Sequence, residues 1–136
     1  MLASDHREHR KNVRVISRTK IASAGAGQIV VDRGTAFVAH LCGEGVTLVN
    51  VKNPCDPKVI SKIPAPLSGH SHKVQVSGDI MIVNNERYKK FEPWLAGVRV
   101  YDISSTENPR EIGFFETPGK GVHRMWFVDG EFAHIT

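Results

Sequence analysis

The chain has 136 residues, of which 40% are hydrophobic and 24% charged, and its formal net charge is +4. This composition is typical of a folded globular domain and excludes a disordered or collagen-like chain. No apolar run approaches the ~20 residues of a membrane-spanning helix, and residues 1–11 are too polar for a secretory signal. We therefore expect a cytoplasmic protein without a membrane partner. Two cysteines are too few for a disulfide scaffold.

In chain order, the sequence predicts a polar leader over residues 1–12 and then a strand over 13–21. Four further strand-like runs follow, at 28–32, 35–40, 45–51 and 58–64. Valine, isoleucine, threonine and aromatic residues fill these runs, and glycine, proline, asparagine and aspartate bound them. Because no stretch keeps a 3.6-residue apolar period with capping residues, essentially no helix is predicted.

The second half of the chain repeats the first. The pattern of 45–57 recurs 52 positions later at 97–109, with its glycine, its apolar positions and its last proline in register. Upstream the offset is 44, which places Gly34 on Gly78. The predicted copies are 28–64, 72–116 and the start of a third at 124–136. Continued downstream, the offset of 52 places Val74 on Trp126, and we expect Trp126 or Phe127 to pack as core.

Four antiparallel strands in each copy are typical of one blade of a β-propeller. The runs 45–51 and 97–103, each followed by a proline-containing turn, resemble the LVIVD repeat of bacterial β-propellers. Asp102 keeps the aspartate of that motif, whereas Asn50 replaces it. The resemblance covers residues 13–136 and implies an all-β propeller of four-stranded antiparallel blades, about two and a half of which are present. It implies no catalytic residues.

A closed propeller needs roughly 4–8 blades, and a single repeat cannot bury its own apolar faces. We therefore expect this chain to be the N-terminal part of a longer propeller, in which the strand at 13–21 is an outer strand that closes the ring. The remaining blades would come from the same longer chain or from other chains. The alternative is a small, self-contained β-sandwich.

The resemblance also implies where chemistry could sit, because two sets of loops in each blade open on one face. Those loops are 40–44, 65–72, 84–96 and 117–124. They hold four of the seven histidines, and imidazole is a common ligand of Zn, Cu, Fe and Ni. The candidate ligands of a transition metal are His40, His70, His72 and His123. Alternatively these are hydrogen-bonded loop residues, because His72 aligns with Arg124 and no histidine position repeats in register. A dyad of Cys42 with a histidine is also left open.

The segment 85–96 is the largest departure from the repeat, and insertions in repeat proteins commonly map to the binding face. Its aromatic and basic side chains could hold a small-molecule or protein ligand. The candidates for this role are Arg87, Tyr88, Lys89, Lys90, Trp94 and Arg124. Nucleic acid is not an expected partner, because most basic residues are dispersed through strand-like segments.

Two functions follow from these observations. The first is a ligand- or partner-binding module that uses segment 85–96. The second is a metal-dependent hydrolase or oxidoreductase with histidine ligands at the mouth of the propeller channel. The sequence identifies no catalytic residue for either one.

Overall fold

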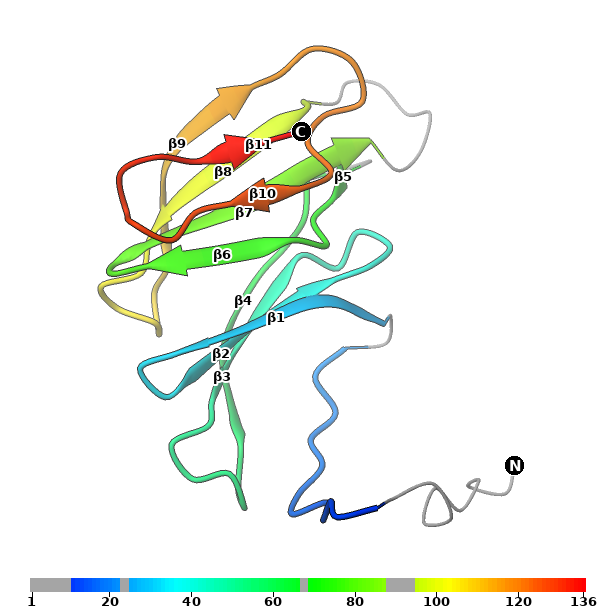
Figure 1. The fold of residues 1–136 in the computed structure, drawn as a ribbon, viewed down its shortest axis with the longest axis vertical. Helices are drawn as coiled ribbons and strands as arrows, with labels where there is room; N and C mark the ends of the chain where they lie inside the picture. Colours follow the sequence, from blue (N-terminus) through cyan, green and yellow to red (C-terminus); the bar gives the residue numbers. More distant parts are fainter. Residues whose placement is uncertain (1–10, 23–24, 67–68, 88–94) are drawn as a thin grey trace.

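The structure is a computed structural model. It describes residues 11–22, 25–66, 69–87 and 95–136 (Figure 1). These residues form short β-strands and no helix, and every strand pair is antiparallel. The predicted all-β class and the predicted lack of helix are confirmed for this part of the chain. Within the same residues, nothing forms a helix that could cross a membrane.

The first sheet contains four consecutive strands in the order of the chain. They are β1 (Ala26–Asp32), β2 (Thr35–His40), β3 (Val46–Asn50) and β4 (Lys58–Ile63). Its two middle strands are almost wholly buried, whereas β1 and β4 alternate between exposed and half-buried positions. The strands lie within a few residues of the four predicted runs.

The second sheet repeats this order and adds a short strand. Its members are β5 (Gly69–His70), β6 (Val74–Ser77), β7 (Ile80–Arg87), β8 (Gly97–Asp102) and β9 (Arg110–Glu116). Both β5 and β6 pair with β7, which is longer than its counterpart β2 and extends into the predicted insertion. The β3–β4 ladder has a bulge at Leu48/Val49, and the β8–β9 ladder has one at the equivalent position, Val100/Tyr101. The two sheets therefore share the position of this β-bulge as well as their strand order.

A third, two-stranded sheet follows, formed by β10 (Met125–Trp126) and β11 (His134–Ile135). β1 packs beside β6, and β6 packs beside β10 (Figure 1). The two larger sheets and this hairpin thus follow one another in a stack, and the first strands of the three repeat copies, β1, β6 and β10, lie side by side in that order.

The core consists of apolar layers between successive sheets. Between the first and second sheets, Phe37 and Leu48 from one side meet Val74, Met81 and Tyr101 from the other. A second layer joins the second sheet to the β10–β11 hairpin, and its buried residues include Ile82, Val98, Met125 and Phe127. A third layer on the opposite face of the first sheet contains Ala36, Val38 and Val49, with Ile21 packed against it.

The structure corrects the predicted register of the first hairpin by one residue. Asp32 pairs with Thr35 in the first sheet, and Ser77 pairs with Ile80 in the second, so Asp32 and Ser77 are the equivalent positions. Gly34 is therefore equivalent to Asp79 and not to Gly78. Aligning the two glycines is wrong because they stand in hairpin turns of different types. A two-residue turn of type I′ prefers glycine at its second position, and one of type II′ prefers it at its first position.

The backbone angles show this difference. In the first turn both Arg33 and Gly34 have positive φ, at 45° and 78°. In the second turn Gly78 has positive φ, at 58°, and Asp79 does not. The two turns therefore have the same length but different types, and the glycines do not mark the same position.

The third copy needs a similar correction. Met125 and Phe127 pack against the second sheet, as Val74 packs against the first. Val74 therefore corresponds to Met125 rather than to Trp126. Since successive strand residues face opposite sides, this one-residue change turns Trp126 outward, where it is 60% exposed. The expectation that Trp126 or Phe127 is core is met by Phe127.

Residues 13–21 form no strand among the described residues, and their role as a strand that closes a ring with a further blade stays a prediction. A strand needs a partner for its backbone hydrogen bonds, and no described strand pairs with this segment. Instead Ser17 Oγ donates to the carbonyl of Pro54 at 2.6 Å, and Ile21 packs on the first sheet.

Candidate metal centre

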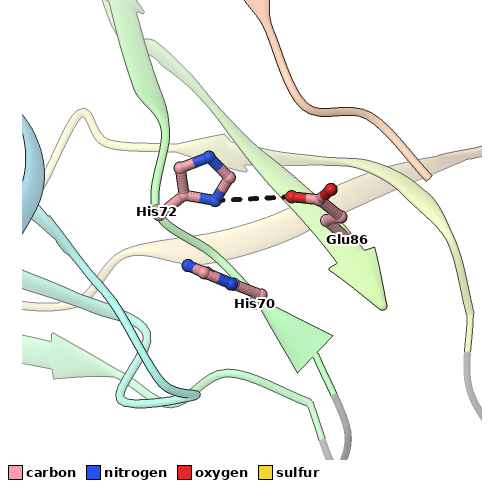
Figure 2. A group of neighbouring side chains, drawn as sticks. All are labelled: His70, His72 and Glu86. Carbon is pink, nitrogen blue, oxygen red and sulfur yellow. Dashed lines mark ion pairs between the residues drawn. The ribbon is translucent and has the colours of Figure 1, made fainter. Parts of the chain in front are cut away.

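Three segments meet at one end of the second sheet and bring two histidines beside a glutamate. His70 ends β5, His72 follows shortly after it, and Glu86 lies near the end of β7 (Figure 2). His70 and Glu86 are direct partners in the β5–β7 ladder, so their side chains share one face of the sheet. The short strand β5 is therefore what places His70 at this position.

The segment before β10 joins the same place. Glu86 makes an isolated bridge with Gly121, and the backbone N–H of Arg87 donates to the carbonyl of Lys120 at 2.8 Å. His123 then follows on the chain, within reach of Glu86. The cluster therefore lies where the second sheet meets the next repeat.

Potential ligand atoms of His70, His72 and Glu86 all lie within 4.8 Å of one another. His72 Nδ1 is 3.8 Å from Glu86 Oε2 (Figure 2), and the rings of His70 and His72 are 4.3 Å apart. His123 Nδ1–H donates to Glu86 Oε2 at 2.9 Å, and its ring lies 4.8 Å from that of His72. Three imidazoles thus surround one carboxylate.

Asn84 ties this cluster to the backbone on both sides. Its fully buried side chain accepts from the N–H of Lys73 at 2.8 Å and donates to the carbonyl of Val122 at 2.8 Å. The same amide nitrogen lies 3.3 Å from His72 Nδ1, which accepts from it. Asn84 therefore fixes the chain on either side of the cluster and orients the ring of His72.

Burial keeps the two inner histidines neutral. The pKa of His72 is lowered to about 4, chiefly by loss of solvent and also by the neighbouring His70. Loss of solvent is also the main cause of the lowered pKa of His70. At neutral pH the contact between His72 and Glu86 is therefore not an ion pair. Neutral imidazole is the form that binds a metal.

His40, the fourth predicted metal ligand, is not part of this cluster. It is 1% exposed, and its Nε2 lies 2.9 Å from the hydroxyl of Thr47 on the neighbouring strand. Burial also lowers its pKa. Its place in the ladder between β2 and β3 agrees with the alternative of a hydrogen-bonded histidine.

The residues predicted to bind a ligand are only partly described. Arg87 ends β7 and is half-buried, and Arg124 is exposed beside the end of the chain, where its carbonyl accepts from Thr136 at 3.0 Å. Tyr88, Lys89, Lys90 and Trp94 lie outside the described residues. Cys42 and Cys55 are exposed and form no disulfide with each other, and they lie in turns at opposite ends of β3.

Sequence reasoning missed Glu86 and the relation between two of the histidines. Glu86 lies within the predicted insertion 85–96, but in the structure it belongs to the extension of β7. The conclusion that no histidine position repeats was also wrong. His72 stands two positions before Val74, and His123 stands two positions before Met125. The corrected register thus makes these histidines equivalent, and it was hidden by the one-residue error.

No family model matches the chain, and no curated protein or solved structure is similar enough to count as a match.

Proposed function

We propose that the two sheets and the β10–β11 hairpin are consecutive blades of a β-propeller. Four features support this proposal: the strand order within each sheet, the apolar layers between sheets, the bulges at equivalent positions, and the adjacent first strands. A ring of roughly 4–8 blades needs more sheets than these. The others would come from the same longer chain or from other chains.

We propose further that this segment binds a divalent transition metal through His70, His72 and Glu86. The observation that carries the proposal is the convergence of their ligand atoms within 4.8 Å. Two imidazoles and one carboxylate form a common ligand set of zinc in proteins. With bonds of about 2.0–2.1 Å, a tetrahedral metal holds its ligands roughly 3.3 Å apart, so small side-chain rotations would complete the site.

The neighbours of these ligands suit such a site. Asn84 holds the backbone on either side of the cluster, and His123 donates to Glu86 and would orient the carboxylate. Hydrogen bonds of this kind to metal ligands are common around protein metal sites. Because the inner histidines are neutral at neutral pH, protons would compete weakly for them.

Three protein ligands leave one position of a tetrahedral metal open, as in catalytic zinc sites. This observation favours a metal-dependent hydrolase as a second candidate function, in which the metal would polarise a substrate or activate water. An oxidoreductase would need a redox-active metal at the same position. The separate proposal of a ligand-binding module rests on segment 85–96, of which 88–94 lie outside the described residues.

Zinc titration by calorimetry at pH 7.5 tests the metal proposal. We expect the chain, first stripped with a chelator, to bind one zinc ion. Glu86→Gln keeps the shape of the side chain but removes its charge, and should weaken binding at least tenfold. Since His72 is buried, His72→Asn is tested alongside, with circular dichroism to verify folding.

The matched control is His134→Ala, which removes an exposed histidine of β11 outside the cluster. It should bind zinc as the unaltered chain does. The proposal fails if the unaltered chain binds no zinc stoichiometrically, or if His134→Ala weakens binding as much as Glu86→Gln.

A further inference from the structure

The repeat position that His72 occupies in the second copy is a glycine in the first. Asp32 and Ser77 are equivalent residues at the ends of β1 and β6, and counting back the same distance from each reaches Gly27 and His72. His123 holds this position in the third copy. One position of the repeat is thus glycine, histidine and histidine in succession.

This position carries one extra residue in every copy. In the first sheet the register shifts around Gly27, which has no partner in the β1–β2 ladder. In the second, the three residues between His70 and Val74 face only two residues of β7. In the third, the N–H groups of His123 and of the residue after it donate to the same carbonyl, that of Thr136. An extra residue of this kind re-aims a side chain out of the regular alternation of a strand.

Gly27 lies directly against the backbone of His72. A Cβ at Gly27 would stand 2.5 Å from the carbonyl oxygen of His72 and 2.8 Å from its Cβ. Contacts to a Cβ below 3.0 Å essentially never occur, so a methyl group here would force a displacement of about half an ångström. The φ angle of Gly27 lies outside the left-handed region, so it is the contact with His72 that excludes a side chain.

Hydrogen bonds on both sides of this contact hold β1 in place. The side-chain oxygen of Gln28 accepts from the N–H of Val74 at 3.1 Å, two residues after His72. Just before β1, the carbonyl of Gly25 accepts from the N–H of Leu41 at 2.8 Å. Because β1 cannot withdraw without breaking such bonds, a side chain added between them would displace His72 instead.

From these contacts we infer that Gly27 is a positioning residue of the proposed metal centre, through which the first sheet sets the place of His72. The inference rests on the proposed function. The groups of a binding site need to be held within about 0.5 Å of their productive geometry. A methyl group at Gly27 would exhaust that tolerance. The metal centre therefore draws on three consecutive repeats, because His123 of the third repeat orients Glu86.

Zinc titration of Gly27→Ala tests this inference. We expect its zinc affinity to fall about 10–100-fold, as for other residues that orient metal ligands. The matched control is Gly25→Ala in the same segment, where the new Cβ would lie 3.5 Å from the Leu41 side chain, an ordinary contact. It should bind zinc as the unaltered chain does. Circular dichroism verifies that both variants fold.

The absorption spectrum with cobalt(II) in place of zinc separates positioning from a loss of stability. At saturating cobalt the visible bands report the geometry of the ligands around the metal. They should change in Gly27→Ala and stay unchanged in Gly25→Ala, whereas a variant that is only less stable would give the spectrum of the unaltered chain.

Gln28→Ala probes the same contact between the sheets without adding an atom, and it decides the question if Gly27→Ala does not fold. It should lower the zinc affinity severalfold, because the segment after His72 loses its anchor on the first sheet. Zinc affinity and cobalt spectra that match those of the unaltered chain in both variants would overturn the inference and leave the metal proposal standing. An unaltered chain that binds no zinc would overturn both.

Discussion

At the residue scale, His72 combines deep burial with a titratable ring. Its pKa of about 4 lies below the ordinary value of 6.5, chiefly because burial disfavours the charged form. Above pH 6.5 the ring is neutral in both the folded and the unfolded chain, and its titration does not affect stability. As the pH falls from 6.5 toward 4, the unfolded chain takes up a proton that the folded chain excludes, so stability falls.

We therefore predict that His72 destabilises the fold by on the order of 2–3 kcal/mol as the pH is lowered through this window. Urea unfolding of the metal-free chain at pH 7 and pH 4.5 measures the loss. His72→Asn should lose less stability over the same interval, because carboxylates contribute equally in both proteins. Equal losses in the two proteins would contradict the low pKa.

At the scale of the elements, the glycine that opens the third strand of each repeat has a steric reason. Gly45 and Gly97 occupy equivalent positions, and a Cβ at either would collide with a carbonyl of the fourth strand, that of Ile63 or of Phe115. Their φ angles of 83° and 152° are also unfavourable for other residues. Because the third and fourth strands of each repeat approach closely here, this position has room only for glycine.

Gly45→Ala and Gly97→Ala should each destabilise the chain by about 2–5 kcal/mol, from overpacking together with backbone strain. The matched control is Gly78→Ala, where φ is 58° but no atom lies within 4 Å of the added Cβ. It should cost only about 1–2 kcal/mol. Thermal or urea unfolding compares the three, and equal losses would show that strand approach is not the cause.

The same elements show how far the sequence predicted the structure. Alternating apolar residues and turn residues were enough to locate the strands of both sheets, because their periodicity follows from burial of one face. The register is harder to predict from the sequence than the strand positions, because two hairpin types place glycine at different turn positions. An error of one residue moves every side chain of the strand to the opposite face of the sheet. Of the metal candidates, His70, His72 and His123 come together, but Glu86 required knowledge of the β5–β7 pairing.

At the scale of the whole molecule, the stack of sheets and the His/Glu cluster are connected. The cluster lies where the second sheet meets the β10–β11 repeat, so residues from two repeats contribute to it. His72 and His123 occupy equivalent positions at the start of adjacent strands. A repeat architecture of this kind brings equivalent side chains together at the place where first strands are neighbours.

X-ray absorption at the zinc edge of the zinc-loaded chain tests the proposed metal centre most directly. We predict nitrogen and oxygen ligands at about 2.0–2.1 Å, with outer-shell scattering from at least two imidazole rings. The imidazole signal should decrease in His72→Asn and persist in His134→Ala. A shell of oxygen ligands alone, with no imidazole scattering, would contradict the account.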